Sequence, residues 1–555
     1  MDSPIPKPSI SVDEKQSLDR HSSNADDHSN HGPAGKRKLP LGWKILMIVL
    51  TCLCTFGNHW SNALIVALKT TIIKNLHINN SQFATLVAVT NLVNTFLCIG
   101  IGFCIDRWGG APLSVVLAFF HLCGSVVMSG SATNHLNSYP LLIFGKVLAA
   151  IGDGSLDNAQ HRIFSTYFAP GKGFAFSIGA IWYVGFAIRL QPSYIVEKRS
   201  VANLAQFTGQ STANIISTNT HTFAWTLWIS SIIALFSLLC AIALVFLDRY
   251  LRVKYDVTDQ TSGERHVGRI KTGTFNLSAI RHLPITFWLI VLFAVFENAG
   301  VQSFVSISTQ FAQQRLQKDA VIGGWVSSFY LLLPAGLTPF LGIFIDVFGH
   351  RVSFLFVSGL TFLISMLLLK FSHTVPSFVT PAPQVEIVRS IIPDPSYFAT
   401  GFAIKKSVVQ ASIVIITTAA GRLQDLSPTD SLDPAVSLWL SYAFVSVAVS
   451  GLLLVLSFGK TTLPAARLSQ VRPTDKKGEL EAIWRAQVRG ISGEEELSWQ
   501  EKEKILKSPS ERSTLLVSFV YPLIALVIII LGWVMFGLGA GWGVHGSVIA
   551  GTTGE

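Results

Sequence analysis

The sequence predicts an all-α polytopic membrane protein with two pseudo-symmetric six-helix bundles and one extra C-terminal transmembrane helix. Half of its 555 residues are hydrophobic and only 13% are charged, whereas soluble domains carry about a quarter charged residues. The apolar residues form runs of roughly 20, the length that a helix needs to cross the hydrocarbon of a bilayer. A Gly-x-x-x-Asp-x-x-Gly turn follows an apolar run once in each half, at 102–109 and 342–349. A charged turn repeated in both halves indicates two homologous bundles.

The elements follow in a clear order along the chain. Residues 1–40 are rich in Ser, Asp, His and Pro, which predicts a disordered cytoplasmic tail. The apolar periodicity then predicts spans over 43–68, 82–105, 112–131, 138–160, 174–195, 223–247, 285–310, 322–345, 352–371, 398–420, 436–459 and 513–540. They divide the chain into an N-terminal helix bundle (41–247), a basic cytoplasmic linker (248–284), a C-terminal helix bundle (285–459), a charged cytoplasmic segment (460–512), the extra helix (513–540) and a tail (541–555). Residues 196–222 are expected to form a polar luminal loop.

The second half lacks a clear fourth span. Residues 371–397 carry prolines at 376, 381, 383, 393 and 395, together with Glu386 and Arg389. No continuous apolar helix of 20 residues fits there, so the fourth helix of this half is expected to be truncated. A segment lost through a gene-model or splice error and a real deletion both explain this pattern.

The net charge of +10 is interpreted as a signal of topology. The basic residues cluster beside the spans, before the first one and in the linker between the bundles, which places both stretches in the cytoplasm. No basic block is interleaved with aromatic residues, so we expect no nucleic-acid partner.

The six cysteines lie in or beside apolar runs, which predicts no structural disulfide. The sequence shows no nucleotide-phosphate loop, metal-ligand cluster or nucleophile triad, so we expect neither an enzyme nor a cofactor.

The repeated turn is the first candidate functional motif. Its glycines would allow close helix approach, and its aspartates would accept hydrogen bonds from the N-terminus of a neighbouring helix. Such a contact, broken and remade, would serve as a latch; an ordinary tight turn is the alternative. The motif residues are Gly102, Asp106, Arg107, Gly109, Gly342, Asp346, Gly349 and Arg351.

Charged residues inside the spans are the second candidate set. A charge within the bilayer costs about 3 kcal/mol or more, so such residues should line an aqueous path or pair with one another. Lys146, Asp153 and Asp157 share one helical face, and Lys405 and Lys406 follow one another in a later span. Arg189 lies in the fifth span, and Asn58, His59 and Asn62 form a polar patch in the first. Snorkelling toward the nearer membrane surface is the alternative to a binding role for Arg189, Lys146 and the two later lysines. Helix packing is the alternative to a binding role for His59. The predicted substrate-binding residues are Asn62, Asp153, Arg189, Glu297, Asn298 and Lys405.

Several motifs resemble the major facilitator superfamily, and within it the branch called major facilitator superfamily domain-containing protein 1. They are Asn79-Asn-Ser-Gln-Phe83, Cys98-x-x-x-Gly102-Phe-Cys-Ile-Asp106-Arg107, Phe144-Gly-Lys with Ile151-Gly-Asp-Gly-Ser-Leu156-x-x-Ala159-Gln160, Phe287-Trp288-Leu289 and Ile343-Phe-Ile-Asp346. The resemblance implies lysosomal or vacuolar residence and export of dipeptides by a uniport-like cycle. It also implies an acid in the fourth span and an arginine in the fifth that hold the charged ends of the peptide. Here those positions are Gly154, beside Asp153, and Phe186, one turn before Arg189.

Two functional hypotheses follow. The first is a secondary-type transporter of a small zwitterionic or anionic organic solute, such as a dipeptide, an amino acid or a carboxylate, working by alternating access. The second is a non-transporting, carrier-like receptor or a chaperone for a partner membrane protein. The expected partners are the solute, the lipid bilayer and, as a candidate, a single-span accessory membrane protein. The lysosomal or vacuolar membrane is the expected location, with the plasma membrane as the alternative.

Overall fold

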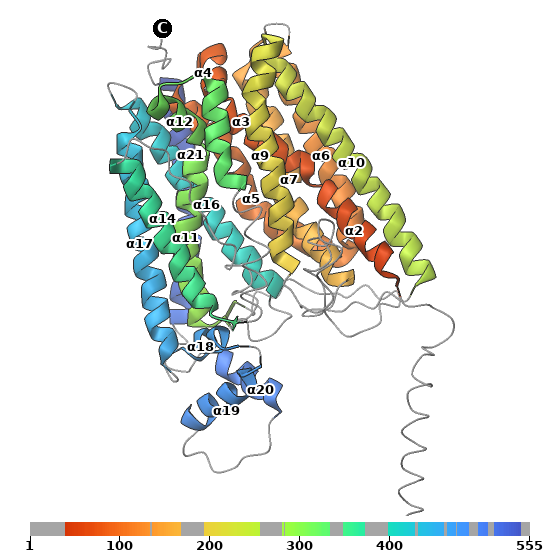
Figure 1. Ribbon diagram of the computed structural model, residues 1–555, viewed down its shortest axis with the longest axis vertical. Helices are drawn as coiled ribbons and strands as arrows, with labels where there is room; N and C mark the ends of the chain where they lie inside the picture. Colours follow the sequence, from red (N-terminus) through yellow and green to blue (C-terminus); the bar gives the residue numbers. More distant parts are fainter. Residues whose placement is uncertain are drawn as a thin grey trace, which may run out of the picture.

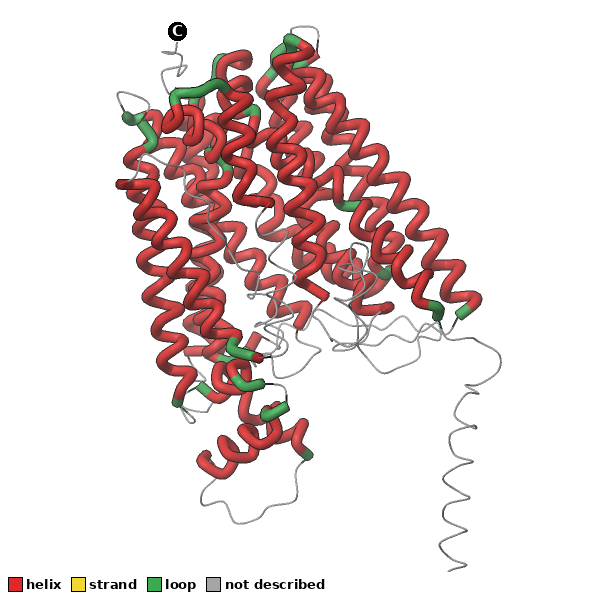
Figure 2. The backbone as a smooth tube through the Cα atoms, viewed as in Figure 1, coloured by secondary structure: helices red, strands yellow, loops and turns green. Residues whose placement is uncertain are grey.

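The described part of the computed structural model is built almost entirely of helices (Figure 2). It describes residues 39–133, 136–167, 194–255, 280–281, 283–332, 348–371, 398–427, 431–459, 463–472, 474–487, 498–508 and 516–545. Within these ranges, nine helices are long and apolar enough to cross a membrane. The end at which α2 begins and α10 ends is called the cytoplasmic end, following the charge prediction, and the opposite end the luminal end.

The N-terminal bundle begins with a crossing that is broken into three helices. These are α2 (Leu41–Leu53), α3 (Phe56–Ala67) and α4 (Lys69–Leu76). The bundle continues with α5 (Asn80–Trp108), α6 (Gly110–Ser131), α7 (Tyr139–Tyr167), α9 (Tyr194–Thr220) and α10 (Phe223–Lys254). Buried apolar side chains of the broken crossing, including Leu64, Ile65 and Leu68, form a core with residues of α5, α7 and α10. This burial holds the interrupted helix in place.

The C-terminal bundle repeats this plan. It contains α11 (Ile285–Val305), α12 (Ser308–Leu316), the short helix Ala320–Leu332, α14 (Arg351–Phe371), α16 (Phe398–Asp425) and α17 (Asp433–Phe458). α3 packs on α9 and α10, and α11 correspondingly packs on α16 and α17. The two bundles stand side by side in Figure 1.

Backbone geometry shows the same internal repeat. α4 and α12 both end on a residue with left-handed backbone, His77 (φ 50°) and Gln317 (φ 52°). The repeated turn has a glycine at positive φ in each half, Gly109 (φ 89°) and Gly349 (φ 74°). Each pair has the same spacing along the chain as the two copies of the turn, as expected for duplicated bundles.

One expected loop is a helix in the structure. Residues 194–220, expected to be mostly a polar loop, form helix α9, which packs on α3. Hydropathy misses α9 because the side chains that it buries, Gln210, Ser211 and Asn214, are polar. The predicted span over 174–195, with Arg189, lies almost entirely outside the described residues, as do residues 372–397, where the truncated helix was expected.

The extra C-terminal helix is present as α21 (Tyr521–His545), preceded by a short π-helix (Leu516–Val520). α21 packs on α5 of the first bundle and on α16 of the second. The indole Nε1 of Trp533 donates to Thr95 Oγ1 on α5 at 3.0 Å. Gly532 faces Ala411 on α16, where an added Cβ would lie 3.1 Å from the alanine. The helix therefore covers one seam between the two bundles.

The charged segment 460–512 contains a small helical unit at the cytoplasmic end (Figure 1). It consists of α18 (Pro464–Gln470), α19 (Lys476–Gln487) and α20 (Trp499–Lys507). Leu468, Leu480, Ile483 and Leu506 form its apolar core. Ion pairs tie its helices together, including Arg467–Glu479 at 2.9 Å and Lys476–Glu503 at 2.7 Å.

Candidate functional site

The backbone of α7 is shaped by glycines around Asp153. A Cβ on Gly152 would collide with the Leu117 carbonyl and His121 of α6, and a Cβ on Gly154 would overlap the Asn94 side chain of α5. Each glycine thus lets α7 approach a different neighbouring helix. Successive residues of a helix point about 100° apart, so Asp153 points toward a third neighbour. That neighbour is α3.

The Asp153 carboxylate is held by two amides of α3. Asn58 Nδ2 donates to Oδ1 at 2.5 Å, and Asn62 Nδ2 donates to Oδ2 at 2.6 Å. Lys146, two turns earlier on α7 and only 4% exposed, donates from Nζ to Asn62 Oδ1 at 2.7 Å. The structure therefore brings the predicted residues Asn62 and Asp153 into direct contact. Amide donors and a nearby ammonium group stabilise an ionised carboxylate inside a membrane protein.

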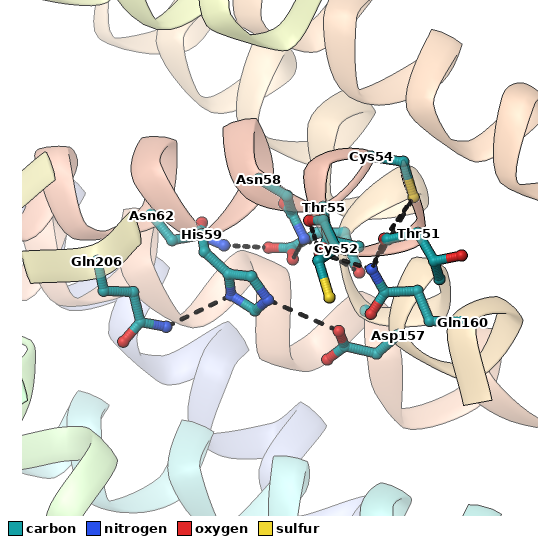
Figure 3. Close-up of polar contacts among 12 residues, drawn as sticks. Thr51, Cys52, Cys54, Thr55, Asn58, His59, Asn62, Asp157, Gln160 and Gln206 are labelled. Atoms are coloured by element: carbon teal, nitrogen blue, oxygen red, sulfur yellow. Dashed lines mark hydrogen bonds and ion pairs between the residues drawn. The ribbon is translucent and has the colours of Figure 1, made fainter. Parts of the chain in front are cut away.

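A second acid–base contact lies one turn along the same helices (Figure 3). His59 Nε2 is 3.7 Å from Asp157 Oδ1, and the side chains are 14% and 33% exposed. The other ring nitrogen, Nδ1, is 3.4 Å from Gln206 Nε2 on α9. One imidazole thus connects α3, α7 and α9.

Gln160 of α7 compensates for the break between α2 and α3 (Figure 3). The amide of Thr55 bonds to the Cys52 carbonyl rather than to the Thr51 carbonyl that a continuous α-helix would use. Gln160 Nε2 donates to this Thr51 carbonyl and to Thr55 Oγ1. Broken helices persist in membranes where side chains satisfy the backbone groups that the break leaves over.

The second bundle contributes one ammonium group to this region. Lys406 Nζ, from α16, donates to the Gly154 carbonyl of α7. Asp153, Asp157 and Cys98 are close enough to interact electrostatically with it. Lys406 is therefore a charged link between the bundles. Of the two adjacent lysines we predicted Lys405 as the substrate-binding residue, but it is Lys406 that reaches the acids of α7.

The predicted residues of the C-terminal bundle lie elsewhere. Glu297 of α11 is 2% exposed and accepts a hydrogen bond from Ser358 Oγ of α14 at 3.0 Å. Asn298, next to it, is half-buried, and Lys405 of α16 is 5% exposed. Glu297 thus faces a neighbouring helix of its own bundle. Arg189 lies outside the described residues.

The repeated turn is only partly described. Gly109 connects α5 to α6, and Arg107 is exposed at the end of α5. Among the described residues, a Cβ on Gly102 would meet nothing within 4 Å, so the expected close helix contact at Gly102 stays a prediction. A close approach occurs at Gly110, where a Cβ would collide with the Ala159 carbonyl of α7.

In the second copy of the turn, Gly349 lies against the α18 end, where a Cβ would be 2.7 Å from the Val471 carbonyl. Arg351 begins α14. Gly342, Asp346 and the side chain of Asp106 are outside the described part of the structure. The proposed latch therefore stays a prediction.

The luminal ends of the bundles are joined by hydrogen bonds. The Asp425 carboxylate of α16 accepts from the backbone N–H groups of Asn80 and Ser81 at the start of α5, at 3.0 and 2.9 Å. Lys69 Nζ donates to Gln424 Oε1 at 3.0 Å, across the same boundary. Asn214 Nδ2 of α9 donates to the Ala320 carbonyl at 2.9 Å. These contacts join the two bundles at the luminal end.

Two helical bundles with internal repeats, joined by hydrogen bonds at one end and by Lys406 in the interior, have the architecture of a membrane carrier. The Major Facilitator Superfamily model matches residues 51–385. The chain therefore belongs to the Major Facilitator Superfamily, and the two-bundle fold expected from the sequence is confirmed.

Curated relatives confirm the resemblance to the expected branch. The chain is 23% identical over 395 residues to the lysosomal dipeptide transporter MFSD1 of Danio rerio, covering 69% of this chain and 81% of the relative. It is 23% identical over 425 residues to the MFSD1 transporter of Homo sapiens, covering 72% and 85%.

Solved structures support the fold alone. The D-xylose-proton symporter aligns with a TM-score of 0.51 at 11% identity, covering 74% of this chain and 96% of the other. The inward open xylose transporter XylE from E. coli aligns with a TM-score of 0.52 at 13% identity, covering 74% and 95%.

Proposed function

We propose that the protein carries a small zwitterionic or anionic organic solute across its membrane by alternating access, with a dipeptide as the favoured substrate. Membership of a family of carriers supports the general activity, and the curated relatives are named as dipeptide transporters. At 23% identity, those names support a substrate class and not a specific peptide.

The observation that carries the proposal is the position of Lys406. Its ammonium group comes from one bundle and meets the α7 segment that bears Asp153 and Asp157, from the other bundle. A zwitterion offers one ammonium and one carboxylate, which match an acid on one side of such a path and a lysine on the other. Both oxygens of Asp153 already accept amide hydrogen bonds. We therefore assign the solute's ammonium to Asp157 and its carboxylate to Lys406.

Glu297, Asn298 and Lys405 are assigned a supporting role in the C-terminal bundle. Buried ionisable residues in membrane helices commonly mark transport pathways. For these three residues the assignment rests on burial and chemistry alone.

The test is counterflow in proteoliposomes. Vesicles loaded with an unlabelled dipeptide should take up the labelled dipeptide in a saturable manner. Asp157→Asn and Lys406→Met should each lower the uptake rate at least tenfold. Lys370→Met is the matched control, since this exposed lysine bonds to Ser437 at the luminal end of its own bundle. An inactive but folded wild type would contradict the proposal.

The lysosomal or vacuolar membrane is the proposed location, supported by the names of the relatives. Co-localisation of the tagged protein with a lysosomal marker tests this location.

A single-span accessory membrane protein is a proposed partner, to be sought by co-purification in mild detergent.

The second candidate function is a non-transporting receptor or chaperone. α21 favours it, because a helix across the seam between α5 and α16 ties together the two bundles that a carrier moves against each other. Saturable counterflow would eliminate this candidate.

A further inference from the structure

The titratable groups around Asp157 come from several helices. His59 of α3 is 3.7 Å from the carboxylate, and Lys406 of α16 interacts with it electrostatically. Asp153 lies one turn away on α7, and Cys98 of α5 also faces Lys406. From α9 the nearby group is the uncharged amide of Gln206. From α6, His121 interacts electrostatically with Asp153, Lys146 and His59.

His59 is suited to exchange a proton in this setting. Histidine is the side chain whose ordinary titration falls near physiological pH. Its ring lies between a carboxylate oxygen, 3.7 Å from Nε2, and an amide nitrogen, 3.4 Å from Nδ1, so the charge of the carboxylate favours a proton on Nε2. The amide of Gln206 donates to a neutral ring nitrogen, and after a flip its oxygen accepts from the protonated ring. The two side chains are 14% and 33% exposed, whereas the atoms that face each other, His59 Nε2 and Asp157 Oδ1, are shielded from solvent.

We propose that His59 and Asp157 form a proton-release site, in which binding of the solute's ammonium group to Asp157 expels one proton from His59. In the empty carrier the imidazolium of His59 pairs with the Asp157 carboxylate. When the solute's ammonium group binds to the Asp157 carboxylate, it would share this acid with the imidazolium. Two neighbouring cations repel each other, so the imidazolium of His59 gives its proton to water. The charge on Asp157 is balanced by one cation before and after the exchange.

This inference rests on the proposed binding of a solute ammonium at Asp157 and adds the ion that is exchanged. Its consequence is a linkage between pH and affinity. While His59 is protonated in the empty carrier, the apparent affinity falls about tenfold for each unit decrease in pH.

The experiment measures the protons released on binding. Purified protein is titrated with a zwitterionic dipeptide by calorimetry, in two buffers that differ in ionisation enthalpy, at several values between about pH 5 and 8. The expected result at acid pH is the release of about one proton per solute and a weakening affinity. His59→Gln, which keeps a polar side chain between Asp157 and Gln206, should bind with a pH-independent affinity and release no proton over this range.

Two controls keep the outcomes separate. His221→Gln changes a histidine in the turn between α9 and α10 and should behave as the wild type. If the wild type binds the dipeptide without releasing protons, or if His59→Gln still releases them, the proton-release site is overturned while the transport proposal stands. If the wild type binds no zwitterion at any pH but transports a pure anion, the ammonium assignment at Asp157 falls, and this inference falls with it.

Discussion

At the scale of single residues, buried amides stabilise the interior of the N-terminal bundle. Asn58 and Asn62 satisfy both oxygens of Asp153, and Gln160 satisfies a carbonyl that the break in the first crossing leaves over. Asn214 performs the same task at the second break, donating to the Ala67 carbonyl at 3.0 Å. Loss of a donor from such an enclosed acceptor costs about 1–3 kcal/mol.

Replacing Gln160 tests this role. Gln160→Leu should lower the free energy of unfolding by about 1–3 kcal/mol, because the buried Thr51 carbonyl and Thr55 hydroxyl lose an amide donor and the carbonyl keeps the weak thiol donor of Cys54 at 3.2 Å. Thermal unfolding in detergent measures the change. Asn75→Ala is the matched control, since it removes an amide-to-carbonyl hydrogen bond from an exposed helix surface. Equal losses for the two variants would contradict the role given to Gln160.

Part of the site could be predicted from the residues alone. A polar Asn62 and an acidic Asp153 inside apolar runs indicated an internal site, and the structure places them 2.6 Å apart. The choice between Lys405 and Lys406 could not be made this way. Adjacent residues of a helix differ by about 100° in direction, and only the packing of α16 decides which one faces the other bundle. Gln160 belongs to a motif that resembles the family, but its contact with Thr51 could not be predicted, because the helix break that it bridges arises from tertiary structure.

At the scale of elements, the cytoplasmic unit caps a transmembrane helix. Gln470 Oε1, at the end of α18, accepts from the backbone N–H groups of Val352 and Ser353 at 3.0 and 3.3 Å, and its Nε2 donates to Ser353 Oγ at 2.9 Å. The first N–H groups of a helix lack partners within it, so this side chain acts as a cap for α14. The charged segment is thereby attached to the second copy of the repeated turn.

Gln470→Ala should weaken this attachment. Loss of a helix cap costs about 1 kcal/mol, so hydrogen exchange at residues 352–353 should become about fivefold faster. Exchange measured by mass spectrometry checks this. Thr474→Ala, which removes an exposed contact with Asp475, should leave the rate unchanged. An unchanged rate in Gln470→Ala would refute the capping role.

Acid should loosen the same unit. Burial opposes ionisation of Glu503, but the ammonium groups of Lys507 and Lys476 outweigh it and hold the pKa of this carboxyl below its ordinary value of 4.5. A lowered folded pKa contributes stability above the ordinary value, and that stability is lost as the pH falls through the folded pKa. Exchange in α19 and α20, corrected for intrinsic rates, should therefore rise below about pH 4.5. Glu503→Gln should raise exchange at neutral pH and remove most of this acid response. Because the Glu503 and Lys476 side chains are partly exposed, the loss of stability on acidification should stay below about 1 kcal/mol.

The elements themselves were predictable to different degrees. Apolar runs predicted α5, α6, α10, α14 and α17 well, because these helices expose apolar faces to lipid. α9 was missed since it buries Gln210 and Asn214 against other protein. Hydropathy reports lipid contact, and a helix that lines a polar path does not carry that signal.

At the scale of the whole molecule, the bundles meet at the luminal end through Asp425 and the N-terminus of α5. A carboxylate at a helix N-terminus gains from the backbone N–H groups and from the helix dipole. This contact favours the state closed to the lumen.

Asp425→Ala should shift the population toward the state open to the lumen. Removal of a capping carboxylate costs about 1–2 kcal/mol, so a cysteine placed at the buried position Gln310 should react about 5–30 times faster with a membrane-impermeant thiol reagent. The labelling is done with the native cysteines replaced by serine. Asp319→Ala removes a comparable cap inside one bundle, where Asp319 accepts from the Ile322 N–H at 3.0 Å. It should not change the labelling rate, and faster labelling in this control alone would contradict the assignment.

The duplicated architecture could be predicted from the repeated turn in the sequence. In the structure, the last glycine of each copy adopts the positive φ that a tight turn needs. The closed luminal end could not be predicted, because it depends on contacts between residues that lie far apart in the chain, such as Asn80 and Asp425.

Movement of one bundle against the other is tested most directly by joining Lys69 and Gln424. Their side chains meet across the luminal boundary at 3.0 Å. With cysteines at both positions, a short thiol cross-linker should abolish dipeptide counterflow, while each single-cysteine variant treated in the same way keeps its flux. Full counterflow after complete cross-linking would show that the solute does not pass between bundles that open at this end.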